Sequence, residues 1–124
     1  MEPMRWSMLF FTALVILAVA LLLTPVTNAA GKYDDFARCL AQKNAVMYGV
    51  VWCPHCEEQK QLFGSSFQYV KYVECAVPGT HQVTQQCRDL GIRHTPTWIF
   101  GNAERTEGKL SLEQLSEKSG CKLP

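Results

Sequence analysis

The chain has 124 residues, with 12 lysine and arginine side chains against 11 aspartate and glutamate side chains, so its net charge is +1. This near balance argues against a nucleic-acid-binding protein, which would carry a concentrated basic face. Once the apolar N-terminal segment is set aside, the remaining chain is long enough for one small domain with a single core.

The first element is an apolar segment over residues 8–26, which contains no charged side chain. Arg5 precedes this segment and Lys32 follows it, an arrangement that favours an N-terminus in the cytoplasm and a chain delivered outside. The length of the segment lies between that of a signal-peptide core and that of a membrane-spanning helix.

Two interpretations of the apolar segment stay open. If it is retained, the protein is a single-pass cell-membrane protein whose domain lies outside the cytoplasm. If it is cleaved near the small residues Thr27 and Ala29, the protein is secreted or periplasmic. In both cases residues 1–30 are expected to be a short stub plus a signal anchor or signal peptide, and residues 31–124 the folded domain.

The first half of the domain alternates helices and strands. A short helix is predicted over residues 34–44, capped by one of its two leading aspartates. Residues 45–52 form the continuous apolar run of a strand that is covered on both faces. A helix follows over 54–64, with proline in its first turn and glycine at its end. Alternating apolar residues predict a strand over 67–75, and helical spacing predicts a helix over 81–91.

The second half is predicted to contain two strands and a final helix. Residues 97–101 and 105–109 form a hairpin joined by a tight turn. Ser111 caps the last helix, which ends at Gly120. The order α-β-α-β-α-β-β-α predicts an α/β fold with a central mixed four-stranded sheet and helices on both faces.

Two cysteines, Cys53 and Cys56, lie where the first strand of the domain meets its helix. A cysteine at a helix N-terminus is activated as a thiolate, which is the reactive form. A disulfide over so short a loop would constrain the unfolded chain little and would be a poor structural staple. A zinc site would need a second pair at ligand spacing, and Cys75 and Cys87 are too far apart in sequence to provide it. The pair therefore favours redox chemistry, without a metal.

This order of elements, with C-x-x-C at the first strand-to-helix turn and the stretch TPT before the third strand, resembles the thioredoxin fold over roughly residues 33–121. More narrowly, the stretches MYGVVWCPHCEEQKQLFGSSF, YVEC and TPTWIF are similar to the thioredoxin-like domain associated with vitamin K epoxide reductase homologues. Those homologues are membrane proteins that pass electrons from such domains to quinone.

The resemblance implies that Cys53 is the exposed nucleophile and that Cys56 resolves the mixed disulfide. Pro54 and His55 form the dipeptide of the bacterial disulfide-oxidase DsbA family. His55 would stabilise the Cys53 thiolate and so make the disulfide a stronger oxidant. Thioredoxins carry a buried acid where this chain has Met47, so Cys56 lacks its usual proton acceptor and a thioredoxin-type reductase is disfavoured.

The resemblance also implies a substrate-binding edge. Pro96 corresponds to the cis-proline that faces the C-x-x-C motif and leaves a backbone edge free for an extended substrate chain. Thr95 is shared with periplasmic isomerases, so the choice between oxidase and isomerase stays open. Trp52 and Trp98 are candidates for an apolar patch around the sulfurs, and a place in the core of the strands is the alternative.

The other four cysteines are expected to form structural disulfides. Cys75 ends a strand and Cys87 lies on the next helix, so a local bridge forms easily. Cys39 on the leading helix and Cys121 after the last helix would then tie the two ends of the domain together. An electron relay through the Cys75–Cys87 pair is an alternative.

These inferences predict an extracytoplasmic thiol–disulfide oxidoreductase that acts on cysteine-containing proteins and needs no cofactor beyond its Cys53–Cys56 pair. The expected direction is that of an oxidase, reoxidised by a quinone-linked membrane protein of the vitamin K epoxide reductase type. A disulfide isomerase or reductase is the alternative within this class. A redox-inert, disulfide-stapled peptide-binding module is the alternative from another class.

Overall fold

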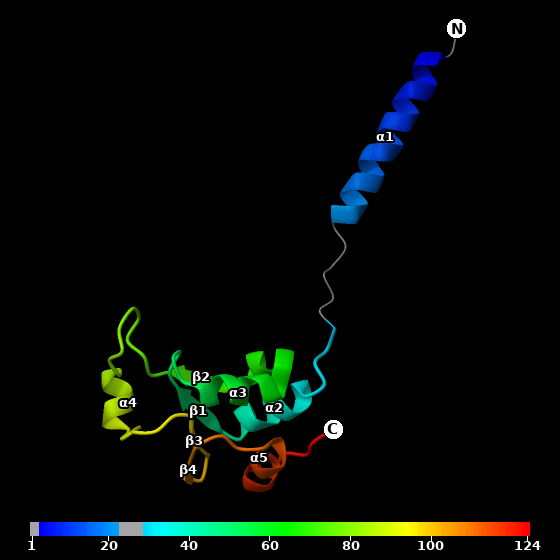
Figure 1. Cartoon of the computed structure of the whole chain (residues 1–124). Helices are drawn as coiled ribbons and strands as arrows, with labels where there is room; N and C mark the ends of the chain where they lie inside the picture. The colour runs from blue at the N-terminus through cyan, green and yellow to red at the C-terminus, as the bar shows by residue number, and fades with distance from the viewer. Residues whose placement is uncertain (1–2, 23–28) are drawn as a thin grey trace.

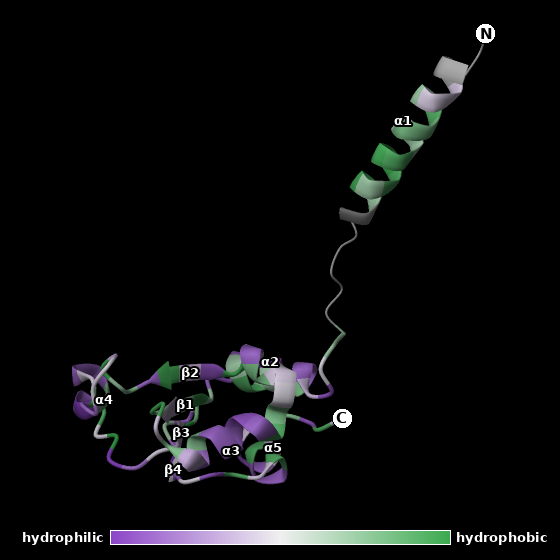
Figure 2. Ribbon diagram, turned by 45° about the horizontal axis from the view of Figure 1, so that its top comes forward, coloured by the Kyte–Doolittle hydropathy of each residue, from purple (hydrophilic) through white to green (hydrophobic). Residues whose placement is uncertain are grey.

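The computed structural model describes residues 3–22 and 29–124 (Figure 1). Its first element is the helix α1, Pro3–Leu22, whose side chains over residues 6–20 are all exposed. Figure 2 shows that most of this helix is hydrophobic. The predicted N-terminal helical element is therefore present.

The localisation predicted from the apolar segment is wrong where it required a single-pass cell-membrane protein. Within the described residues, no helix has both the length and the apolar character that crossing a membrane demands. Of the predicted apolar segment, the described part of α1 contains Met8 to Leu22. Residues 23–26 of the predicted segment, and Thr27 of the predicted cleavage site, lie outside the described residues.

The domain contains four further α-helices, a 3-10 helix and four strands. In chain order they are α2 (Asp34–Gln42), β1 (Val46–Gly49), α3 (Pro54–Phe63), η1 (Gly64–Tyr69), β2 (Lys71–Glu74), α4 (Gln85–Asp89), β3 (Thr97–Ile99), β4 (Arg105–Glu107) and α5 (Leu112–Ser119). The strands form one sheet in the order β2-β1-β3-β4. β1 pairs with β2 in parallel and with β3 antiparallel, and β4 pairs antiparallel with β3. The predicted α/β, thioredoxin-like fold with a mixed four-stranded sheet is confirmed.

Helices cover both faces of the sheet. Successive strand residues point to opposite faces, so their side chains enter two separate cores. Met47 and Trp98, both fully buried, face the main core, which α2, α3 and α5 cover. Tyr48 and Ile99 pack against a smaller cluster on the other face, beside α4. Figure 1 shows this division, with α4 on one side of the strands and the other three helices on the opposite side. The smaller cluster consists of Val50, Cys75, Ala76, Cys87 and Ile92.

All four strands are shorter than predicted: β3 and β4 each end two residues early, at Ile99 and Glu107, and β1 and β2 differ most. β1 ends at Gly49, because Val50–Trp52 turn toward the next helix and the Cys53 N–H bonds back to the Val50 carbonyl at 3.1 Å. β2 begins only at Lys71, because the residues before it form η1. The ring of Phe67 on η1 packs against Phe63, with ring centroids 6.0 Å apart. Local aromatic packing therefore outweighs the alternating pattern that predicted a strand from residue 67.

The predicted ends of the helices are confirmed in part. Ser111 caps α5 with a capping box, and Gly120 ends it with a left-handed backbone. α4 is much shorter than the predicted helix over 81–91, because Val83 pairs with Ala76 and the helix starts only after its Thr84 cap. The predicted aspartate cap of the first domain helix is wrong, because the N-cap of α2 is Tyr33, which makes no side-chain cap hydrogen bond. Asp34 is the first helical residue, and its carboxylate accepts from the Gly31 N–H at 2.9 Å.

Two disulfides cross-link the domain, one over a long loop and one over a short loop. The Cys39–Cys121 bond, with sulfurs 2.09 Å apart, ties α2 to the segment that follows α5. The Cys75–Cys87 bond, with sulfurs 2.02 Å apart, ties the end of β2 to α4. Cys53 and Cys56 carry free thiols.

Candidate active site

The sequence around Cys53 places its sulfur at the N-terminus of α3. The turn after β1 makes Cys53 the N-cap of α3, and Pro54 occupies the first turn, where its missing N–H leaves no hydrogen bond unmade. Cys53 Sγ accepts a hydrogen bond from the Cys56 N–H at 3.1 Å. A sulfur takes here the role that a hydroxyl or carboxylate plays in most helix caps.

Cys53 is half-buried, and the balance of its surroundings favours the thiolate. Burial alone would raise the pKa of Cys53, but hydrogen bonds from Cys56 and from the Thr95 side chain outweigh it, so that the pKa lies below its ordinary value. Backbone hydrogen bonds from Cys56 and His55 act in the same direction. The Thr95 carbonyl oxygen, 3.3 Å from Cys53 Sγ, accepts only from the neutral thiol. The donors to the sulfur prevail over this one acceptor.

Cys56 lies one turn further into α3 and is only 1% exposed. Burial raises the pKa of its thiol to about 11, and the hydrogen bond with Cys53 adds to this shift. The pKa values of the two thiols thus differ in the direction that suits disulfide exchange. The outer thiol, Cys53, ionises readily, and the inner thiol, Cys56, keeps its proton.

The space beside Cys56 is shared with Tyr72. A side-chain carbon added to Gly49 would lie 3.0 Å from Cys56 Sγ and 3.1 Å from Tyr72 Oη, so both polar atoms border the same small volume. The Tyr72 hydroxyl donates to Glu74 Oε2 at 2.7 Å. Burial, followed by this contact with Glu74, raises the pKa of Tyr72 well above its ordinary value.

His55 is expected from its sequence position to stabilise the Cys53 thiolate. Its side chain is 69% exposed, and Nδ1 lies 3.6 Å from Glu58 Oε2. Glu58 also binds Lys109 Nζ at 2.6 Å, and this contact lowers the pKa of Glu58. The imidazole is therefore directed at an exposed carboxylate, and the His55 contact that acts on Cys53 is made by the backbone.

The predicted substrate edge lies on the other side of Cys53. The peptide bond between Thr95 and Pro96 is cis, and the Thr95 carbonyl reaches Cys53 Sγ. Trp52 is 38% exposed, and its ring lies 4.8 Å from that of His81 between centroids. Trp52 and Thr95 also line one pocket, together with Val50, Cys75, Val83, Ile92 and Arg93. Trp98, the other tryptophan considered for this patch, is fully buried in the core.

A buried polar network holds α3 in place behind the thiols. Gln59 is completely buried, and its Oε1 accepts from Trp98 Nε1–H at 3.2 Å and from the Leu110 N–H at 2.8 Å. Its Nε2 donates to the Leu110 carbonyl at 2.9 Å. These hydrogen bonds connect the helix that carries Cys56 to β3 and to the segment before α5.

Sequence reasoning missed Gln59, Tyr72 and Glu74. Two of them had a detectable signal, because Tyr72 and Glu74 lie two residues apart at the end of a strand parallel to β1. The carboxyl ends of parallel strands meet at the same edge of a sheet, and Cys53 follows β1 at that edge.

Within residues 3–22 and 29–124, no group of three histidine, cysteine or acidic side chains is arranged to hold a metal ion.

The comparisons with known proteins point to a thiol-disulfide oxidoreductase. No family model matches the chain. The chain is 35% identical over 105 residues to the protein named "Thiol-disulfide oxidoreductase LTO1" from Arabidopsis thaliana, an alignment that covers 81% of this chain. The chain spans 28% of the length of that protein. The chain is thus a thioredoxin-like domain with a free C-P-H-C dithiol, similar to part of a plant thiol-disulfide oxidoreductase.

Proposed function

We propose that this chain is a thiol–disulfide oxidoreductase that exchanges disulfides with cysteine-containing proteins through Cys53 and Cys56. The observation that carries the proposal is the asymmetry of the two thiols. Cys53 is accessible with a lowered pKa, whereas Cys56 is buried with a pKa of about 11. The similarity to the plant oxidoreductase supports the same chemistry.

In the oxidising direction, a substrate thiolate attacks Sγ of Cys53 in the Cys53–Cys56 disulfide. The bond between the two protein sulfurs breaks, its electron pair goes to Cys56, and the substrate is held by a mixed disulfide. A second substrate thiolate then attacks the substrate's own sulfur in that mixed disulfide and releases the Cys53 thiolate. The substrate leaves oxidised by two electrons, and the Cys53–Cys56 pair is left reduced.

The proposed direction is that of an oxidase. Stabilising the Cys53 thiolate stabilises the reduced pair, which makes the disulfide a stronger oxidant. Pro54 supports this by opening α3, and His55 by its backbone contact with Cys53. The Cys39–Cys121 and Cys75–Cys87 bonds suit a compartment in which disulfides persist.

The proposed partners follow from the resemblance to domains associated with vitamin K epoxide reductase homologues. A quinone-linked membrane protein of that type would reoxidise the Cys53–Cys56 pair. Protein substrates would lie along the edge formed by Thr95 and Pro96, with an apolar side chain against Trp52. No separate cofactor enters this scheme, because the dithiol itself carries the two electrons.

The test is oxidation of a reduced protein substrate, such as ribonuclease, by the full chain in its disulfide form. We expect substrate thiols to disappear in a stoichiometric burst, and Cys53→Ala to abolish this burst. Cys56→Ala should instead accumulate a mixed disulfide with substrate once an oxidant such as glutathione disulfide is supplied. Equal oxidation by wild type and Cys53→Ala would contradict the proposal. Faster repair of a scrambled substrate than oxidation of a reduced one would favour the isomerase.

A further inference from the structure

The buried thiol of Cys56 needs a partner that exchanges protons with it. Cys56 must lose its proton whenever it attacks the mixed disulfide at Cys53, and it regains one when the disulfide is reduced. Thioredoxin-type proteins provide an acid on the preceding strand, where this chain has the buried, apolar Met47. The side chains on the neighbouring strand offer another route.

Tyr72 on β2 is placed to serve Cys56. β2 pairs with β1 in a register that sets Tyr72 opposite Met47 and Glu74 opposite Gly49. Because Gly49 has no side chain, Cys56 Sγ and Tyr72 Oη both border the space beside its Cα. The hydroxyl is thus a polar atom that borders the same space as the buried thiol, opposite the strand position where the usual acid is missing.

Glu74 accepts the hydrogen bond of the Tyr72 hydroxyl, and two backbone N–H groups hold its carboxylate in place. Glu74 Oε2 receives the Tyr72 hydroxyl at 2.7 Å. Glu74 Oε1 accepts from the Val51 N–H at 3.2 Å and from the Ala76 N–H at 2.9 Å. The carboxylate therefore lies beside the turn that leads to Cys53. Its Oε1 binds the backbone, and its Oε2 is left to the Tyr72 hydroxyl.

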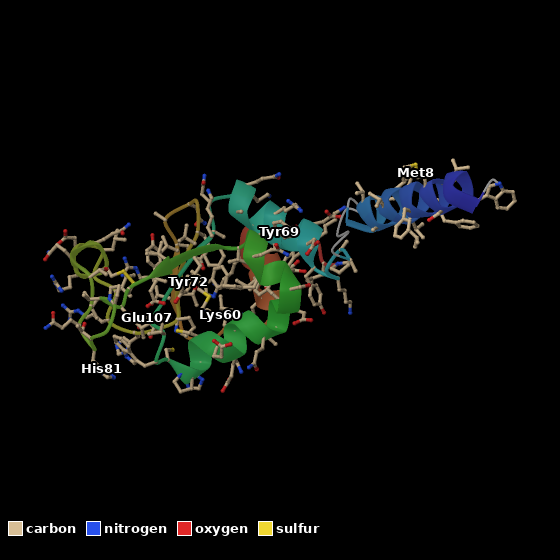
Figure 3. The ribbon with its side chains drawn as sticks, turned by 90° about the horizontal axis from the view of Figure 1, so that it is seen from above. Met8, Lys60, Tyr69, Tyr72, His81 and Glu107 are labelled. Carbon is tan, nitrogen blue, oxygen red and sulfur yellow. A yellow bond between two sulfur atoms is a disulfide. The ribbon has the colours of Figure 1, made fainter. Side chains whose placement is uncertain are left out.

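The charged and titratable groups around this pair come from two elements. From α3, Cys53 and Cys56 face Tyr72 closely enough to raise its pKa, although burial and Glu74 contribute more. Lys60, one turn after Cys56 on α3, places Nζ 4.4 Å from the centre of the Tyr72 ring. Figure 3 shows Lys60 and Tyr72 directed toward one another from α3 and β2. From β2 itself, Glu74 supplies the negative charge.

We propose that Tyr72 and Glu74 form a proton relay for Cys56, in place of the acid that the preceding strand lacks. In the mixed disulfide, the S–H bond of Cys56 breaks and its proton goes to Tyr72 Oη, whose own proton passes to Glu74 Oε2. The electron pair left on Cys56 forms the bond to Cys53 Sγ. The bond from Cys53 to the bound thiol breaks, and that thiol leaves with its electron pair. The relay runs in reverse when the Cys53–Cys56 disulfide is reduced. This inference rests on the proposed function.

The test follows the reaction of the full chain with Ellman's reagent, after reduction of Cys53 and Cys56 alone. Attack by Cys53 releases one coloured thiolate in a first phase, and resolution by Cys56 releases a second in a later phase. We expect Tyr72→Phe to slow the second phase by about a hundredfold near neutral pH, a typical contribution of acid–base catalysis, and to leave the first phase unchanged. The deficit should shrink as the pH rises toward 10, because solvent hydroxide then removes the proton.

Two further variants separate the relay from packing. Glu74→Gln keeps an oxygen for the Val51 and Ala76 N–H groups but removes the charge, and should also slow only the second phase. Tyr69→Phe removes a hydroxyl from η1, away from the dithiol, and should match wild type in both phases. Equal second-phase rates in wild type and Tyr72→Phe across the pH range would overturn the relay, as would equal slowing of both phases. Absence of the first phase in wild type would overturn the proposed function itself.

Discussion

Gln59 offers the sharpest prediction about what holds the active-site helix in place. Replacing Gln59 with leucine keeps the side-chain volume roughly constant but removes every hydrogen bond that the amide makes. Trp98 Nε1–H, the Leu110 N–H and the Leu110 carbonyl would lose their partners. Gln59 and Trp98 are 0% exposed and Leu110 is 5% exposed, so water cannot easily replace the amide.

The magnitude follows from these three groups. Each buried polar group left without a partner costs about 1–3 kcal/mol. The summed cost of the three groups is reduced where the backbone of the slightly exposed Leu110 relaxes toward water. We therefore expect Gln59→Leu to lower the free energy of unfolding by about 4 kcal/mol, against the roughly 5–15 kcal/mol of a typical domain. The loss would be a large fraction of the total stability.

The assay is urea unfolding of the full chain with both structural disulfides intact. We expect the midpoint to fall while the dependence of the free energy on urea stays the same, because the surface exposed on unfolding does not change. Gln61→Leu is the matched control, since Gln61 is exposed on the same helix, and should change stability by less than about 0.5 kcal/mol. A loss below about 1 kcal/mol for Gln59→Leu would refute the reasoning.

Further predictions concern the cysteines. Replacing Cys39 and Cys121 with alanine should cost about 4.5 kcal/mol and replacing Cys75 and Cys87 about 3 kcal/mol, since the closed loops span 82 and 12 residues. Urea unfolding measures both, and an equal or larger loss for the shorter loop would contradict the loop-entropy argument. With the Cys53–Cys56 pair reduced, iodoacetamide labelling followed by mass spectrometry should modify Cys53 first, at a pH below the ordinary thiol pKa of 9.0; simultaneous labelling of both thiols would be inconsistent with the site described. The stability of the reduced protein should decline between about pH 9 and pH 11, because folded Cys56, with a pKa raised from 9.0 to about 11, binds its proton more tightly than the unfolded chain does. Cys56→Ala should remove this part of the decline.

Local sequence signals were sufficient where neighbouring residues determine the structure. Pro54 predicted the start of α3, and Ser111 with Gly120 predicted both ends of α5. These positions depend on the backbone preferences and cap hydrogen bonds of a few adjacent residues, so the sequence alone reveals them. The order of helices and strands then restricts the topology of the sheet.

Features that depend on tertiary packing could not be predicted from the sequence. The alternating residues that suggested a strand from residue 67 include Phe67, whose ring packs against Phe63 and Tyr72 from a 3-10 helix. The register of the parallel strands sets Glu74 opposite Gly49 and Tyr72 opposite Met47. This register brings the Tyr72 hydroxyl to the space beside Gly49 that Cys56 Sγ also borders. Register follows from the packing of the whole sheet, so the sequence alone shows only that β2 ends near the active-site turn.

The orientation of the His55 side chain also depends on its neighbours. Its sequence position, between the two cysteines, suggested an imidazole directed at the Cys53 sulfur. In the structure, Glu58 lies one turn along α3 with Oε2 3.6 Å from His55 Nδ1, while the backbone of His55 contacts Cys53. The exposed ring remains a candidate for contact with a substrate.

The reduction potential of the Cys53–Cys56 pair tests the central claim most directly. The full chain would be equilibrated with defined ratios of reduced and oxidised glutathione, and the fraction of Cys53–Cys56 disulfide measured by alkylation and mass spectrometry. A potential well above the roughly −270 mV of thioredoxin is predicted, because the stabilised Cys53 thiolate favours the reduced pair. A potential at or below that of thioredoxin would contradict an oxidase, and a pair that never equilibrates with glutathione would contradict disulfide exchange altogether.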